Sequence, residues 1–207
     1  MPRDGRATRE RILTTAERLV IDNGYAATSV DQVIAESGTS KGAFFHHFQS
    51  KRALADALVD RYVESDISML EAALEHARTE TDDPVERALA FVRYFEDAGD
   101  EVMREQSGCL YTSILTERQL VDAGASDPIA KAVVTWREGY AELLRDALAG
   151  SPHEVDVDAV SDHVFVTFEG AFLLARTTGD PSHMRSQLRT LRVLLSALLG
   201  RTATPKG

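Results

Sequence analysis

The sequence predicts an all-α fold of about nine helices, with a three-helix head at the N-terminus and a helical body behind it. Apolar residues recur at the spacings of three and four that place them on one face of a helix. No run of alternating β-branched residues is long enough to predict a strand. Glycines and prolines divide the chain into segments of helical length. We therefore expect a head over residues 1–52 and a body over residues 53–207.

The first helix is predicted over about residues 8–23. Gly24 follows it, at the position where a left-handed residue commonly ends a helix. The apolar side chains of this segment share one stripe, as expected for a helix packed on a core: Ile12, Leu13, Ala16, Leu19 and Val20.

Two short helices are predicted next, and a tight turn joins them. The second helix begins after Thr28 or Ser29, whose side chains are typical of a helix start. Gly38 ends it, and a third helix of about two turns begins at Thr39 and Ser40. Two short helices joined at a glycine and braced by a first helix are typical of a helix-turn-helix.

The remaining predicted helices are longer. Ser50 caps a fourth helix that extends to about Arg78 and links head to body. A sixth helix begins near Cys109, and a seventh contains Val133 to Leu144. The other three segments have clearer limits: residues 84–97, 156–178 and 182–199.

Charge is unevenly distributed along the 207 residues, whose formal net charge is −10. Residues 1–52 hold eight Lys or Arg against six Asp or Glu, a net of +2, which leaves −12 for residues 53–207. A mildly basic head on an acidic body is compatible with nucleic acid binding by the head alone.

Composition also excludes several protein classes. No apolar run reaches the roughly 18 residues of a membrane-spanning helix, and the N-terminus lacks a secretory apolar segment. A single cysteine, Cys109, permits no intrachain disulfide and no cysteine-rich zinc site. We therefore expect a cytoplasmic protein without cofactor or metal, stabilised by its core alone.

A helix-turn-helix reads DNA with its second helix, which here is the third helix of the chain. The free N–H groups and the positive dipole end at the start of that helix favour a phosphate, and Gly42 lets the backbone approach closely. We expect double-stranded DNA as a partner. The predicted contact residues are Thr28, Ser29, Thr39, Ser40, Lys41, Gly42, Phe44, Phe45, His46 and Lys51.

The segment Ser-Lys-Gly-Ala-Phe-Phe-His-His-Phe-Gln-Ser-Lys-Arg-Ala-Leu over residues 40–54 resembles the recognition segment of the tetracycline-repressor (TetR) family. The resemblance extends without a gap over residues 8–56. It implies an all-helical fold of about nine helices and a variable body that binds a small-molecule effector. It also implies dimerisation through the last two long helices and repression that the effector relieves.

Position 45 departs from this family pattern, which usually has a tyrosine whose hydroxyl contacts a phosphate. Phe45 cannot make that bond. Because neighbouring helical positions differ by about 100°, Phe44 is expected to pack inward while Phe45 faces the groove. Core packing of both rings is the alternative. The adjacent His46 and His47 do not converge as a metal pair does, so a phosphate contact is the better hypothesis.

Aromatic and polar residues of the body form a candidate effector site, because such sites are apolar with a few polar groups. The alternative is that these aromatics are simply core. The candidate ligand-binding residues are Phe91, Tyr94, Cys109, Tyr111, Thr112, Trp136, Tyr140 and Phe168.

Cys109 suggests a second trigger. Gly108-Cys109-Leu110 resembles a segment of one branch of the same family, some of whose members sense electrophiles through this cysteine. A thiol at a helix N-terminus has a lowered pKa and is more reactive. A buried, inert thiol is the alternative.

The last two predicted helices carry apolar faces wider than one core contact needs. The apolar residues of the first are Val160, Val164, Phe168, Phe172 and Leu173, and those of the second are Leu188, Leu191, Val193, Leu194, Leu195, Leu198 and Leu199. A homodimer through a four-helix interface would bury both faces and place two recognition helices about 34 Å apart. The DNA site should then be palindromic.

Two other classes of protein are alternatives for an all-helical chain. A helical enzyme would need Cys109 with His163, or the carboxylates of Glu117 and Asp122, but no catalytic motif accompanies them. A helical protein whose head binds another protein would share the same fold. Substitution of Lys41 by alanine distinguishes the two. It should weaken binding of the head to DNA, but it would leave a complex with another protein largely intact.

Overall fold

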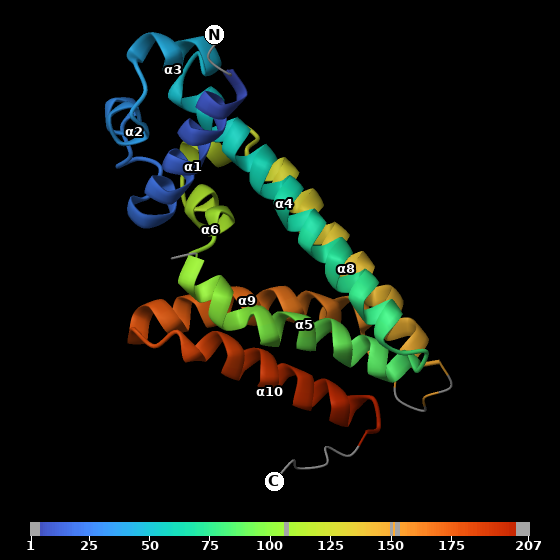
Figure 1. Cartoon of the computed structure of the whole chain (residues 1–207). Coiled ribbons are helices and arrows are strands. Elements are labelled where there is room, and N and C mark those ends of the chain that lie inside the picture. Colours follow the sequence, from blue (N-terminus) through green and yellow to red (C-terminus); the bar gives the residue numbers. More distant parts are fainter. Residues whose placement is uncertain (1–4, 106–107, 150, 152–153, 202–207) are drawn as a thin grey trace. The chain divides into compact units, whose positions relative to one another are not determined.

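The computed structural model describes residues 5–105, 108–149, 151 and 154–201, and the regular structure in them is entirely α-helical (Figure 1). The predicted all-α class is confirmed. The described residues form ten helices rather than about nine, because the short α7 follows α6 directly. Their bounds are α1 Gly5–Asn23, α2 Val30–Ser37, α3 Lys41–His47, α4 Lys51–Glu80, α5 Pro84–Glu105, α6 Leu110–Leu115, α7 Arg118–Val121, α8 Ser126–Ala147, α9 Val157–Thr178 and α10 Ser182–Leu198.

The chain forms two compact units that differ from the expected division at residue 52. The first contains residues 1–65 and 107–130, and the second contains residues 66–106 and 131–207. α4 and α8 each contribute residues to both units. A segment more than fifty residues beyond the expected head, containing α6 and α7, therefore folds with the helix-turn-helix.

The first unit is built on the predicted stripe of α1. Ile12, Leu13 and Ala16 are completely buried. Gly24, with φ +86°, ends α1 in the left-handed region that glycine adopts without strain. Arg61 of α4 ties that helix to α1 by donating to the carboxylate of Glu17 at 2.6 Å. These contacts make α1 the common support of α2, α3 and the start of α4.

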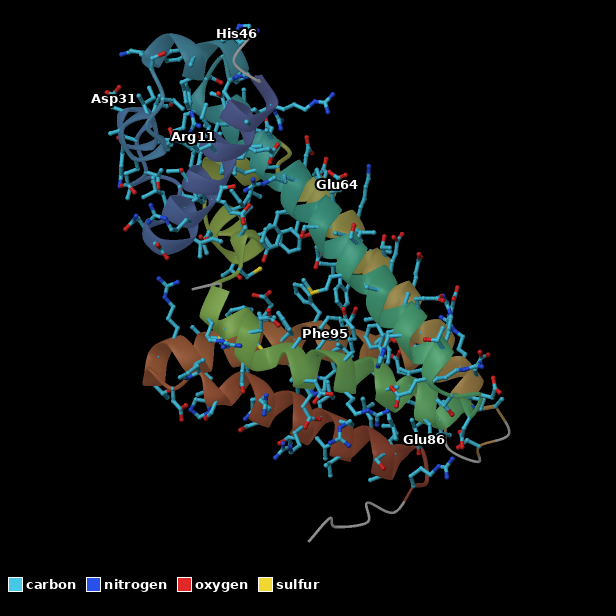
Figure 2. All side chains as sticks on the ribbon, in the orientation of Figure 1. Arg11, Asp31, His46, Glu64, Glu86 and Phe95 are labelled. Atoms are coloured by element: carbon cyan, nitrogen blue, oxygen red, sulfur yellow. The ribbon has the colours of Figure 1, made fainter. Side chains whose placement is uncertain are left out.

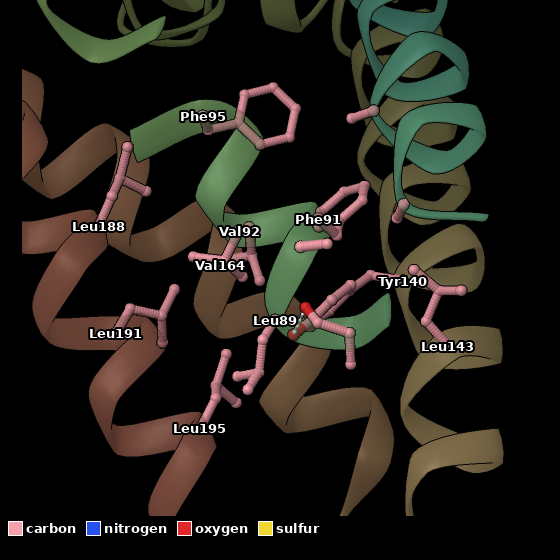
Figure 3. Close-up of a cluster of buried hydrophobic side chains, with 14 of the residues drawn as sticks. Leu89, Phe91, Val92, Phe95, Tyr140, Leu143, Val164, Leu188, Leu191 and Leu195 are labelled. Atoms are coloured by element: carbon pink, nitrogen blue, oxygen red, sulfur yellow. Dashed lines mark hydrogen bonds between the residues drawn. The ribbon is translucent and has the colours of Figure 1, made fainter. Parts of the chain in front are cut away.

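The second unit is built around α10, which packs against both α5 and α9 (Figure 1). Figure 3 shows Leu188, Leu191 and Leu195 of α10 facing Leu89 and Val92 of α5. All five side chains are buried. The contacts between these helices form the apolar core of the unit. A chain with a single cysteine has no intrachain disulfide and depends on such a core for stability.

α5 continues to Glu105, about two turns beyond its predicted end near residue 97. A Cβ at Gly99 would lie 3.3 Å from Cγ of Met184 and 3.4 Å from the backbone nitrogen of Arg185. The glycine lets α10 approach closely, and the packing outweighs the roughly 1 kcal/mol that glycine costs inside a helix. The sequence shows the glycine but not the neighbour that explains it.

A buried carboxylate also joins these two helices. Glu96 of α5 is 5% exposed and accepts hydrogen bonds from Nε of Arg189 at 2.9 Å and Nε of Arg192 at 2.7 Å. Burial by itself would raise the pKa of Glu96, but the hydrogen bonds and charges of the two guanidinium groups outweigh it, and the pKa is lowered. Glu96 is therefore held ionised against α10.

None of the described helices is both long enough and apolar enough to cross a membrane.

Candidate nucleic-acid interface

The helix-turn-helix is formed by α2 and α3, and each begins at a serine cap. Ser29 Oγ accepts the N–H of Gln32 at 3.1 Å, and Ser40 Oγ accepts the N–H of Ala43 at 3.2 Å. Gly38, with φ 62°, ends α2 in the left-handed region, as predicted. Local sequence alone thus specifies both helices and the turn between them.

Arg11 of α1 fixes the turn from behind. Its Nε donates to the carbonyl oxygen of Ser37 at 3.0 Å, across 26 residues of sequence. This bond satisfies a carbonyl at the end of α2, where helical partners run out. Figure 2 shows Arg11 beside the helix-turn-helix, with Asp31 and His46 on its outer side. Sequence reasoning did not identify Arg11 as a support of this site.

Several predicted contact residues lie on the solvent-exposed face of α3, which we call its open side. The Lys41 side chain is 72% exposed and Phe45 is 42% exposed, and Gly42 and His46 are exposed as well. A Cβ at Gly42 would have no described atom within 4 Å. A positive charge, an apolar ring and an approachable backbone stretch thus share one short helix.

Two predicted contact residues are instead inside the first unit. Phe44 is completely buried and Thr28 is 2% exposed. The Thr28 hydroxyl lies 3.1 Å from the carbonyl oxygen of Leu19 and 2.9 Å from that of Gly24, to which it donates. Phe44 packs inward, as its position beside Phe45 predicted. The side chains of Phe44 and Thr28 are therefore in the core of the unit, where they support α3 and the start of α2.

The other polar candidates lie near the helix starts. Ser29 and Ser40 are exposed, and their hydroxyl oxygens cap α2 and α3. The Thr39 hydroxyl lies 2.9 Å from the hydroxyl of Ser37, close enough for a hydrogen bond. These three residues place hydroxyl groups and N-terminal backbone groups close to the start of α3.

Lys51 has partners within its own unit. Its Nζ donates to the carbonyl oxygen of Ala26 at 3.3 Å and lies 4.2 Å from the centre of the Tyr25 ring. Burial lowers the pKa of the Lys51 amine, although the charge of Glu117 opposes the shift. Burial likewise raises the pKa of Tyr25. The Lys51 ammonium therefore contacts the turn between α1 and α2 within its own unit.

The predicted effector residues are divided between the two units. Phe91, Tyr94, Trp136, Tyr140 and Phe168 belong to the second unit, whereas Cys109, Tyr111 and Thr112 belong to the first.

Five of the second unit's aromatic residues form a connected cluster. Phe91 stacks on Tyr140 with ring centres 4.8 Å apart. Phe95 contacts Trp136 at 5.3 Å and Phe168 at 6.2 Å. Phe95, which Figure 3 shows beside Phe91, belongs to the same cluster. Its burial at 2% exposure follows from the packing of α5 rather than from any motif.

Polar atoms distinguish two members of this cluster. The Tyr140 hydroxyl donates to the carbonyl oxygen of Ala88 at 3.1 Å, and complete burial raises its pKa. The indole Nε1 of Trp136 is buried and has no hydrogen-bond partner among the described residues. Tyr140 is a satisfied core residue, whereas Trp136 retains an unused donor beside Phe91 and Phe95.

The Cys109 thiol belongs to a residue that is 7% exposed and directly precedes α6. Its neighbour Tyr111 is buried, and the Tyr111 ring contacts that of Tyr62 at 4.9 Å. Thr112 is exposed. Cys109 therefore lies within the unit that holds the helix-turn-helix.

Only part of the predicted dimer faces on α9 and α10 is exposed, because Val164, Leu188, Leu191 and Leu195 are buried in the core of their own unit. Leu173 of α9 is 69% exposed and Leu194 of α10 is 59% exposed. Val166 and Val193 extend the same two helices' apolar surface at 57% and 43%. Side chains of this kind on monomeric surfaces mark interaction sites when they are contiguous.

Two family models match the chain. The model for bacterial regulatory proteins of the tetR family matches residues 12–58, and the model for a tetracyclin repressor-like C-terminal domain matches residues 84–191. The first match covers the helix-turn-helix and the second covers most of the body.

Curated relatives are also transcriptional regulators by name. An uncharacterized HTH-type transcriptional regulator in the lacX 3′ region of Lactococcus lactis is 26% identical over 190 residues, covering 90% of this chain and 92% of the relative. The HTH-type transcriptional repressor NemR of Escherichia coli is 27% identical over 146 residues, covering 64% of this chain and 70% of NemR.

A TetR transcriptional regulator from Chloroflexus aurantiacus has a similar crystal structure. The TM-score is 0.76 at 25% identity, with 93% of this chain and 96% of that chain covered. The likeness therefore spans both units of the fold and is not limited to the helix-turn-helix.

Proposed function

This chain belongs to the tetR family of bacterial regulatory proteins, a family of DNA-binding transcriptional regulators rather than enzymes, and we propose that it is a homodimeric repressor released from a palindromic operator by an effector. The observation that carries the proposal is the open side of α3. Lys41, Phe45 and His46 are exposed there on a helix held by Ser40 and supported by Arg11. Recognition of bases in the major groove requires that the second helix of the helix-turn-helix, here α3, is exposed and held in a fixed position.

The residues that we propose for DNA contact divide into two kinds. Lys41 and the exposed Ser29 and Ser40 suit phosphates, which position a protein on the duplex. Phe45 lies further along α3, where side chains reach base edges or the sugar, and the exposed His46 beside it is proposed to contact a phosphate. Thr28 and Phe44 contribute by holding α2 and α3 in place, since their own side chains are buried.

The dimer is proposed to form through α9 and α10. Leu173 and Leu194 are the most exposed large apolar residues of the described chain, and a two-fold interface would cover each of them with the partner's copy. Because this interface fixes the two protomers relative to each other, it also sets the distance between their recognition helices. A palindromic operator follows from that symmetry.

The effector is proposed to bind at the aromatic cluster of the second unit. Trp136 supplies a buried N–H that has no hydrogen-bond partner among the described residues. Phe91 and Phe95 supply aromatic surface beside it, and the Phe168 ring contacts that of Phe95. Tyr94 lies at the edge of the cluster, against the ring of His76 at 5.4 Å. We propose that Tyr140 supports the cluster as core.

Cys109 is proposed as an alternative trigger that responds to electrophiles. The relative NemR is named a repressor, and in this chain Cys109 is 7% exposed at the start of α6, within the unit that binds DNA. Modification of so buried a thiol requires α6 to move, and a bulky adduct would keep it displaced. N-ethylmaleimide should release the wild-type protein from its operator but leave Cys109→Ser bound. Equal release of both proteins would remove Cys109 from the mechanism.

The proposed function is tested by selecting genomic fragments with the purified full-length protein. We expect a palindromic consensus, protection of both half-sites in footprinting, and affinity that falls steeply with salt. Reporter expression from such a promoter should rise when the gene for this protein is deleted. Binding without sequence preference, or activation of the reporter, would contradict the proposal. We further expect the protein to act in the cytoplasm, with the DNA that it regulates.

A further inference from the structure

The peptide group of Ala26 is held from both sides in the first unit. Its N–H donates to Oε1 of Glu117 at 2.9 Å, and its carbonyl oxygen accepts from Nζ of Lys51 at 3.3 Å. Ala26 lies in the turn between α1 and α2, Lys51 is the first residue of α4, and Glu117 directly precedes α7. Three segments separated by up to 91 residues thus meet at one peptide group.

A second contact joins two of these segments, the start of α4 and the residues after α7. Nη2 of Arg52 donates to the carbonyl oxygen of Ala123 at 2.9 Å, while its Nε pairs with Asp56 at 2.7 Å. The adjacent basic residues Lys51 and Arg52 therefore reach in two directions, toward the α1–α2 turn and toward the segment after α7. The start of α4 is joined to both by hydrogen bonds.

The turn that Glu117 holds leads directly into the DNA-facing part of the unit. Thr28 follows Ala26 by two residues and is anchored by its hydroxyl to Leu19 and Gly24. Ser29 then caps α2. A displacement of the Ala26 peptide would be passed to the start of α2, because only this short, hydrogen-bonded turn separates them.

We propose that Glu117 is a positioning residue for DNA binding, which sets the start of α2 and the Lys51 ammonium by holding the Ala26 peptide. This inference rests on the proposed function and adds a residue outside the helix-turn-helix to its machinery. Glu117 touches no DNA in this scheme. Through Glu117, the position of the segment over residues 109–121, which includes Cys109, affects the position of the helices that bind the operator.

The carboxylate has two separable properties, hydrogen-bond acceptance and charge. As an acceptor it orders the turn and favours binding. As a negative charge near Lys51 and Tyr25 it weakens the attraction for phosphates. Glu117→Gln keeps an acceptor oxygen and removes the charge, whereas Glu117→Ala removes both. The two variants therefore give different results for a positioning role and for a purely electrostatic one.

The experiment measures operator affinity and amide hydrogen exchange for the wild type, Glu117→Ala and Glu117→Gln, with the full chain and a selected operator. Gln119→Ala is the matched control, because Gln119 is an exposed residue of α7 itself. We expect Glu117→Ala to weaken binding about tenfold, the order of one hydrogen bond to a charged group, and to speed exchange of the Ala26 amide. Glu117→Gln should retain most of the affinity, and Gln119→Ala all of it.

Coupling between sites is reciprocal, so operator DNA should in turn slow amide exchange in residues 110–121 of the wild type. The same protection should be absent in Glu117→Ala. This measurement separates positioning from general destabilisation, because a variant that is merely less stable still transmits the effect of DNA. Thermal melting of each variant identifies any global loss of structure.

Three results would overturn the inference. Unchanged affinity in Glu117→Ala would show that the bond does not matter, and tighter binding by both Glu117 variants would show that only the charge acts. Loss of binding in Glu117→Gln equal to that in Glu117→Ala would also contradict the proposed acceptor. If the wild type binds no operator at all, the proposed function itself fails, which is a distinct outcome.

Discussion

The hydroxyl of Tyr140 donates a hydrogen bond to the carbonyl oxygen of Ala88 at 3.1 Å, and the Tyr140 side chain is 1% exposed. The bond joins α8 to α5 inside the second unit, as the dashed line in Figure 3 marks. Tyr140 was predicted as an effector contact. Its only polar group is engaged with the backbone, so we assign it to the core.

Tyr140→Phe should therefore lower the free energy of unfolding without changing effector binding. The phenyl ring preserves the stack on Phe91, and the lost hydrogen bond should cost about 1 kcal/mol. Chemical denaturation measures the change, and Tyr94→Phe, at a half-buried position, serves as the control with a smaller loss. Unaltered stability together with a lost response to effector would return Tyr140 to the ligand site.

Glu96→Gln should make stability less dependent on pH. The pKa of Glu96 is lower in the folded protein than its ordinary value, so its ionised form favours folding. That contribution is complete above the ordinary pKa of about 4.3 and is lost as the pH falls through the lower, folded-state pKa. We expect the variant to lose about 2 kcal/mol near neutral pH, less than a fully buried pair, and to approach the wild type in acid.

Asp100→Asn is the matched control for that experiment. Asp100 pairs with Arg185 at 2.7 Å between the same two helices, but its side chain is 51% exposed. A surface pair of this kind contributes about 0.5 kcal/mol. A difference between wild type and Glu96→Gln that stays constant from pH 7 into strong acid would contradict a role for the ionised carboxylate.

Lys41→Ala should weaken binding to specific and nonspecific DNA by similar factors. Removal of one phosphate contact should also reduce the slope of log affinity against log salt by about 1. Fluorescence anisotropy at several salt concentrations provides both quantities. Lys131→Ala removes an exposed lysine of α8 and should change neither. A loss confined to one operator sequence would mean that Lys41 reads a base instead.

Leu173→Glu should convert the protein into a monomer. Two-fold symmetry would place the new charge in the interface twice, and desolvation of both carboxylates opposes association. Sedimentation velocity should show the monomer mass, and affinity for the full palindrome should fall by about 100-fold or more, since one head alone then binds. Val134→Glu places the same charge at an exposed apolar residue of α8 and should remain dimeric. A dimeric Leu173→Glu would move the interface elsewhere.

Local rules predicted the head because its signals are short-range. A helix cap acts over three residues and a glycine turn over one, so Ser29, Gly38 and Ser40 could be interpreted directly. The 100° step between neighbours predicted that Phe44 is buried while Phe45 is exposed. The same step left open which body aromatics are core, because burial there depends on helices far apart in the sequence.

The sequence by itself determined an all-helical chain, its helix-turn-helix, its family and the apolar character of α9 and α10. Only the tertiary structure decided that residues 107–130 fold with the head, that Gly99 admits α10, and that Glu117 meets Ala26. The reason is physical. Caps, turns and periodicity are properties of neighbouring residues, whereas contacts across 91 residues depend on how whole helices pack and leave no pattern in the chain.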